Sequence, residues 1–106
     1  MLLEQGHFVG FHVNGHAGYA KHGEDIVCSA VSALTQTIVL GLTEHLHLEA
    51  GISVDEECGE MHCVLSQSCS KTECEQAEIL FSTLYLGLCS IQESYSKYLK
   101  ITQREV

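Results

Sequence analysis

The clearest pattern in the chain is a helical repeat of apolar residues in two long segments. Apolar residues recur every three or four positions over residues 26–47 and again over residues 71–94. Asp25 stands before the first segment and belongs to the residue types that cap helices, so we expect this helix to begin at Ile26. The second segment follows a Ser-x-x-Glu sequence, which is typical of a helix start with a capping box. The chain is therefore predicted to contain two long amphipathic helices.

Shorter segments have the two-residue alternation that is typical of β-strands. Residues 7–14 alternate in this way and are followed by Gly15, which favours a half-buried strand and then a loop up to the first helix. Residues 52–65 contain two short alternating runs on either side of Gly59, which predicts a hairpin. Residues 97–103 are expected to form a last short strand or an extended tail.

This order of elements predicts a single domain over residues 1–106 with an α+β fold. In such a fold, a small and mostly antiparallel sheet has two helices packed on one face. The other face of the sheet is left over, and we expect a second copy of the chain to cover it. The chain is therefore predicted to be a homodimer.

The charge balance limits the kinds of partner. Five Lys and Arg residues against fourteen Asp and Glu residues give a formal net charge of −9. A surface of this sign repels phosphate backbones and favours basic partners, so direct binding to nucleic acid is not expected. No uninterrupted apolar run reaches the length of a membrane span, and the first residues lack the pattern of a signal peptide. A cytoplasmic protein without a membrane partner is therefore predicted.

Six cysteines are many for this chain length, and they stand at positions 28, 58, 63, 69, 74 and 89. Without a sign of secretion, we expect reduced thiols rather than disulfides. The four central cysteines have His62 among them but contain no Cys-x-x-Cys pair, so their spacing supports a structural zinc site only weakly. We expect no metal and no cofactor, and a redox or zinc-binding role for the cluster from Cys58 to Cys74 stays as an alternative.

Cys28 is the residue of greatest chemical interest. If Asp25 caps the helix, Cys28 occupies the third helical position, where unpaired N–H groups and the helix dipole stabilise an anion such as a thiolate. Helix geometry places it at the polar border of the apolar stripe, close to Ser32 one turn later. Unpaired cysteine is also among the most buried residue types, so the pattern leaves a catalytic and a buried structural Cys28 both open.

A catalytic cysteine needs a base that is held in a fixed geometry. His16 directly follows the first predicted strand, which fixes its backbone, whereas His22 lies within a glycine-bounded loop. We therefore prefer His16 as the base. The remaining histidines are expected at the surface of strands or turns (His7, His12 and His62) or on separate faces of a helix (His45 and His47).

Two long blocks of the sequence, "GHAGYAKHGEDIVCSAVSALTQT" and "QAEILFSTLYLGLCSIQESYSKYLKI", closely resemble the ribosomal-processing cysteine protease family, Prp, of Firmicutes and related bacteria. The resemblance covers nearly the whole chain. It implies a small cytosolic dimer of α+β fold that removes a short N-terminal extension from a large-subunit ribosomal protein. The chain has fewer residues before the first block than the family usually has, so a shortened or missing first strand is expected.

The resemblance also assigns roles to individual residues. The family's catalytic histidine corresponds to His16 and its nucleophile to Cys28, whose thiolate would attack the scissile carbonyl while His16 transfers the proton. The accompanying active-site positions correspond to Gly15, Asp25 and Ser32, and the loop from Ala17 to Glu24 corresponds to a segment that orders over bound substrate. The alternative is a non-enzymatic ribosome-assembly or protein-interaction module in which Cys28 is buried.

Overall fold

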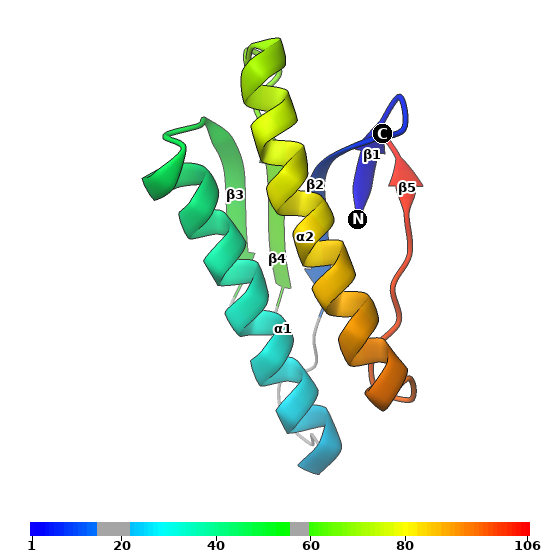
Figure 1. The fold of residues 1–106 in the computed structure, drawn as a ribbon. Helices are drawn as coiled ribbons and strands as arrows, with labels where there is room; N and C mark the ends of the chain where they lie inside the picture. Colours follow the sequence, from blue (N-terminus) through cyan, green and yellow to red (C-terminus); the bar gives the residue numbers. More distant parts are fainter. Residues whose placement is uncertain (15–21, 56–59) are drawn as a thin grey trace.

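The computed structural model describes residues 1–14, 22–55 and 60–106, with the backbone alone at residues 22–25. Its five-stranded sheet has the order β3-β4-β2-β1-β5, antiparallel except for the β1–β5 pair. Figure 1 shows both long helices on one face of this sheet, so the predicted α+β fold is confirmed. Along the chain the elements are β1 (Leu2–Glu4), β2 (His7–Asn14), α1 (His22–Leu40), the π-helical η1 (Gly41–His45), β3 (Ala50–Asp55), β4 (Glu60–Leu65), α2 (Lys71–Tyr95) and β5 (Arg104–Glu105).

The first helix begins earlier than the sequence predicts. α1 starts at His22, so Asp25 lies within its first turn and the prediction that Asp25 caps the helix is wrong. Acidic residues are favoured both at the cap and in the first turn, because each position places a carboxylate at the positive end of the helix dipole. Composition alone therefore could not separate the two positions. At the other end the helical stretch continues through η1 to His45, and His47 then adopts a left-handed φ of 55°.

The second helix and the hairpin form where the sequence predicts them. α2 starts after Ser70, which accepts a hydrogen bond from the Glu73 amide in the predicted capping box. β3 and β4 pair in antiparallel register, and their connection, residues 56–59, lies outside the described residues. Of the two forms expected for residues 97–103, a strand or an extended tail, the strand is not found there, because β5 covers only Arg104–Glu105. At the N-terminus, β1 is present but short, and β2 covers the whole of the strand predicted over residues 7–14.

Phe11 on β2 and Phe81 on α2 join the sheet to the helices. Their rings lie 6.3 Å apart in an edge-to-face arrangement, and both side chains are almost completely buried. Burial of an aromatic or large aliphatic side chain contributes about 1.5–3 kcal/mol, so this contact is a major part of the core. Leu42, Leu84 and Cys63 complete the most deeply buried group.

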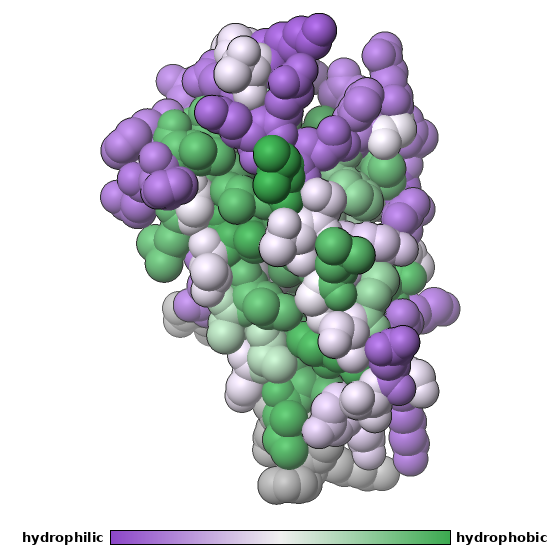
Figure 2. Space-filling model, viewed as in Figure 1, coloured by the Kyte–Doolittle hydropathy of each residue, from purple (hydrophilic) through white to green (hydrophobic). Residues whose placement is uncertain are grey.

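The stretch Ile26–His45 is long and apolar enough to cross a membrane by length and composition, with a mean hydropathy of 1.8. The expectation from the sequence, that no uninterrupted apolar run reaches this length, is not contradicted by this helix. It considered uninterrupted runs, whereas this helix mixes apolar residues with Ser and Thr. Here Val31 and Leu42 pack into the core, while Ile26 and Leu40 remain exposed. Figure 2 shows that apolar surface is present on the helix side of the molecule. The absence of a membrane partner stays a prediction.

The close approach of β2 to β4 requires glycine at position 10. A Cβ atom on Gly10 would overlap the carbonyl oxygen of Cys63, whereas a Cβ on Gly51, in the same row of the sheet, would meet only Val64 O at 3.8 Å. We therefore expect Gly10→Ala to lower the free energy of unfolding by about 1–3 kcal/mol. Gly51→Ala should change it by less than about 0.5 kcal/mol. Urea denaturation of both variants tests this, and equal effects would contradict it.

Burial raises the pKa of the Cys63 thiol to about 11. The folded chain then keeps this proton at a pH where the unfolded chain has lost it, so stability is full below about pH 9 and falls as the pH rises to about 11. We expect wild type to lose up to about 2–3 kcal/mol more than Cys63→Ala over this interval. Urea denaturation at several pH values measures the difference, and parallel curves for the two proteins would argue against it.

Candidate active site

Cys28 lies in the N-terminal half of α1 and is exposed. Because the helix begins at His22, Cys28 is its seventh residue, and the expectation that it lies in the first turn is wrong. The unpaired N–H groups of the helix start therefore lie before it and do not surround its thiol. The alternative in which Cys28 is a buried structural residue is also wrong. An exposed thiol on a regular helix is available to a substrate.

The side of α1 that carries Cys28 faces away from α2. Buried Val31 marks the face toward the sheet, and at about 100° per residue Cys28 lies about 60° to one side of it and Leu34 about 60° to the other. Leu34 points toward α2, since a methyl group at Gly87 would lie 3.3 Å from Leu34 Cδ1. Cys28 therefore opens onto the side of the molecule where β3 forms the free edge of the sheet (Figure 1).

The β3 edge leaves two apolar side chains uncovered. Ile52 is paired with Cys63 and Val54 with Met61, so both side chains lie on the helix-facing side of the sheet. Cys63 is fully buried there, whereas Ile52 is 41% exposed and Val54 53% exposed. Figure 1 shows that α1 runs obliquely to β3, with its N-terminal half directed away from that strand. In the sequence, the alternation of Ile52 and Val54 with polar residues predicts that both side chains face the core. Nothing in the sequence indicates that α1 leaves them uncovered.

Ser32 stands one turn after Cys28 and is exposed on the same flank of α1. Its Oγ accepts a hydrogen bond of 2.8 Å from Gln36 Nε2. This bond uses an acceptor site of the hydroxyl and leaves its proton available for another group. Gln36 was not singled out from the sequence, although its spacing of four residues from Ser32 is a signal that could have indicated it. The neighbouring Thr35 is buried and donates to Val31 O at 2.9 Å.

The remaining predicted site residues cannot be placed next to Cys28. His16 and Gly15 lie outside the described residues, as does the side chain of Asp25. The same holds for most of the loop from Ala17 to Glu24, although its last residues belong to α1.

Three histidines lie on strands, as predicted. His12 and His62 are direct partners on β2 and β4, with ring centroids 5.6 Å apart, and His12 Nε2 lies 2.6 Å from Glu60 Oε1. His7 is largely exposed and its Nδ1 lies 3.0 Å from Glu78 Oε1. None of the three is on the flank of α1 that carries Cys28, so none competes with His16 as its base.

The cysteines outside α1 do not form a metal site in the part of the chain that the structure describes. No three His, Cys, Asp or Glu side chains converge there in a way that could hold a metal ion. Cys58, which belongs to the alternative zinc cluster, lies outside the described residues. The described cysteines are free thiols, as expected, at positions 28, 63, 69, 74 and 89.

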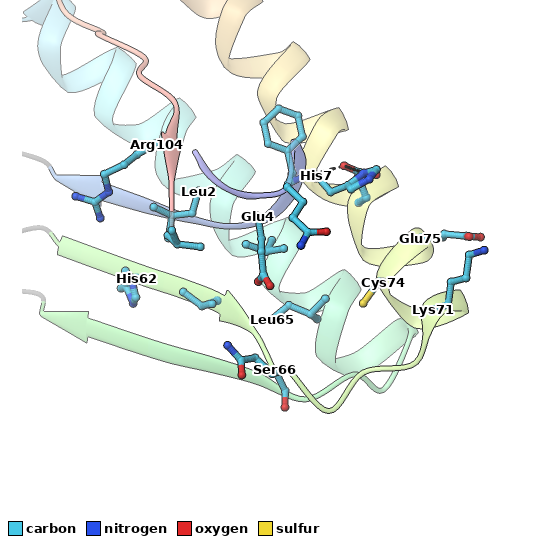
Figure 3. Close-up of a pocket in the computed structure, with 17 residues that line it drawn as sticks. Leu2, Glu4, His7, His62, Leu65, Ser66, Lys71, Cys74, Glu75 and Arg104 are labelled. Atoms are coloured by element: carbon cyan, nitrogen blue, oxygen red, sulfur yellow. Dashed lines mark hydrogen bonds and ion pairs between the residues drawn. The ribbon is translucent and has the colours of Figure 1, made fainter.

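An open pocket of about 800 Å³ lies at the other end of the sheet, between the β1–β2 turn and the start of α2 (Figure 3). Its polar lining includes the His7–Glu78 pair, Lys71 and Arg104. α1 begins at the opposite end of the molecule (Figure 1), so this pocket is separate from the surface around Cys28.

Comparison with protein families gives a match over residues 1–100 to the family described as Cysteine protease Prp. A ribosomal processing cysteine protease Prp from Bacillus subtilis strain 168 is 26% identical over 92 residues, which cover 87% of this chain and 82% of that protein. The protein of the same name from Staphylococcus aureus strain Mu50 is 25% identical over 95 residues, covering 87% and 83%.

Solved structures share the fold. A crystal structure of SMU.848 from Streptococcus mutans superposes with a TM-score of 0.83 at 24% identity, covering 99% of this chain and 90% of that one. The essential ribosomal processing protease Prp from S. aureus, in complex with a substrate peptide, gives a TM-score of 0.85 at 21% identity, covering 97% and 94%.

Proposed function

The chain belongs to the family of cysteine protease Prp, and we propose that it removes the N-terminal extension of a bacterial large-subunit ribosomal protein with a His16–Cys28 dyad. The observation that carries this proposal is the exposed Cys28 on α1, in a chain that matches the family over residues 1–100. The relatives named as ribosomal processing proteases support the kind of substrate.

In the proposed mechanism, the Cys28 thiolate attacks the scissile carbonyl and forms a C–S bond. His16 takes the thiol proton beforehand and later donates it to the departing amine, after which water releases the acyl group from sulfur. Ser32 lies one turn from Cys28 and has its hydroxyl acceptor site occupied by Gln36, so its proton can be donated to the thiolate or to a substrate oxygen. Gly15 and Asp25 are proposed to support the dyad.

We place the substrate on the side of α1 that faces the β3 edge. An edge strand has unpaired backbone N–H and C=O groups, which an extended peptide can use to add a further strand. Ile52 and Val54 present apolar surface beside that edge, so apolar substrate side chains fit there. The net charge of −9 favours the approach of a basic ribosomal protein.

Further properties of the proposed protease follow from the sequence. It acts in the cytoplasm as a homodimer, without direct contact to nucleic acid or membrane. The sheet face opposite the helices is free to receive a second copy and carries His12, His62 and Glu60. The alternative of a non-enzymatic ribosome-assembly module depended on a buried Cys28, and the exposure of this residue counts against it.

The dyad is tested by cleavage of a purified ribosomal protein that carries its N-terminal extension. We expect Cys28→Ala to abolish cleavage and His16→Ala to lower kcat/KM by about 10²–10⁴-fold, since the base assists both proton transfers. Cys89→Ala, which changes a cysteine on α2, should cleave like wild type. Product masses identify the cleaved bond. Undiminished cleavage by Cys28→Ala or His16→Ala would rule out the dyad.

The substrate surface is tested by kinetics on the same precursor. Ile52→Ser should raise KM about fivefold with little change in kcat, because apolar contact worth about 1 kcal/mol is lost in both the ground state and the transition state. Ile79→Ser is the matched control, since Ile79 is also an exposed isoleucine but lies on α2. Equal KM values for the two variants would show that Ile52 does not contact the substrate.

The oligomeric state is tested by sedimentation of the wild-type protein and of the variants. A single-chain mass for wild type would rule out the homodimer.

A further inference from the structure

Two cysteines flank the N-cap of α2, one directly before it and one in the first turn of the helix. Ser70 is the N-cap, and its amide donates to Glu73 Oε1 at 2.8 Å while its Oγ accepts from the Glu73 amide at 3.2 Å. Cys69 therefore precedes the cap and Cys74 is the fourth helical residue. These are the two positions that pack together in a hydrophobic staple, which fixes the direction of the chain entering a helix.

The Cys74 thiol lies against the backbone of Cys69. Cys74 Sγ lies 3.9 Å from the carbonyl oxygen of Cys69, and the Cys74 amide donates to Ser70 O at 2.9 Å. Cys69 Sγ lies 4.0 Å from Glu49 O. Figure 3 shows the sulfur of Cys74 at the edge of the open pocket, on the side of the segment that leads into α2. Cys74 is exposed and Cys69 half-buried, so a small oxidant can reach the pair.

We propose that Cys69 and Cys74 form an oxidation site, which hydrogen peroxide converts into a reversible disulfide within the chain. In the first step the Cys74 sulfur attacks the peroxide; an S–O bond forms, the O–O bond breaks, and the thiol proton leaves with the departing oxygen as water. In the second step Cys69 sulfur attacks Cys74 sulfur, the S–S bond forms, and the S–O bond breaks with release of a second water. The two thiols are oxidised by two electrons and the peroxide is reduced.

The order of the two steps follows from the surroundings of each thiol. Cys74 is exposed in the first turn of α2, so a peroxide in solution reaches its sulfur directly. Burial, together with the nearby carboxylates of Glu73 and Glu49, raises the pKa of the Cys69 thiol. A smaller fraction of Cys69 is therefore ionised at neutral pH than of an ordinary cysteine thiol, and Cys69 acts as the resolving thiol.

The other described cysteines are poorly placed to take part. Cys63 is fully buried. Cys89 lies four helical turns beyond Cys74 on α2, and Cys28 lies on the other long helix, near its start at the opposite end of the molecule. The oxidation site uses neither Cys28 nor His16 and is independent of the proposed cleavage reaction.

The site is tested with the full chain, reduced, freed of reductant and then treated with hydrogen peroxide. Cys28→Ala serves as the background, because it removes a competing exposed thiol. Trypsin cuts after Lys71, between the two cysteines, so their disulfide appears in mass spectrometry as two linked peptides whose fragments assign the bond. We expect uptake of iodoacetamide to fall by two thiols per chain and to return after dithiothreitol.

Single serine variants provide the controls. Cys69→Ser and Cys74→Ser should lose the linked peptides, and in Cys69→Ser a dimedone adduct should mark the sulfenic acid left on Cys74. Cys89→Ser should form the link like the background protein. A bond to any other cysteine, a bond between two chains, or oxidation of both thiols to sulfinic or sulfonic acid without a link would overturn the proposal. Circular dichroism of the reduced variants verifies that each is folded.

Discussion

The contact between Phe11 and Phe81 is where the two layers of the molecule meet. Phe11 is central in β2, which pairs with β4 on one side and β1 on the other, and Phe81 lies near the middle of α2. The close approach of β2 to β4 at Gly10 lies directly beside this contact. Because α2 is fixed on the sheet here, the position of every other element is set relative to it, including that of the helix that carries Cys28.

The exposure of Cys28 is a consequence of how α1 packs on α2. Leu34 meets α2 opposite Gly87, and Gly41 approaches Leu80, so small residues allow the two helices to lie close together. This contact turns the Cys28 flank of α1 outward, toward the free edge of the sheet. A larger residue at Gly87 would rotate or displace α1 and move Cys28 relative to the edge strand. The geometry around the candidate nucleophile therefore depends on packing at positions that carry no chemistry.

Much of the fold could be predicted from local pattern. α2 was predicted almost to the residue because a capping box and a long apolar stripe agree, and the hairpin was predicted because both strands alternate. The start of α1 was missed because an aspartate such as Asp25 is favoured both at the cap and in the first turn of a helix. The burial of Thr35 was missed because its hydroxyl is satisfied within the helix, which no hydropathy pattern reveals. The uncovered Ile52 depends on the crossing direction of α1, a tertiary feature without a local signal.

The cysteines illustrate why residue type alone does not determine chemistry. Cys63 is fully buried, where desolvation keeps its thiol protonated and inert. Cys28 is exposed on a regular helix, in a family whose members are proteases, and as a nucleophile it would need a base from outside that helix. Cys69 and Cys74 lie between these extremes, since they stand on either side of the capped start of α2 and only Cys74 is exposed. The same side chain is therefore a buried core residue in one place and the proposed nucleophile or oxidation site in another, according to its burial and its surroundings.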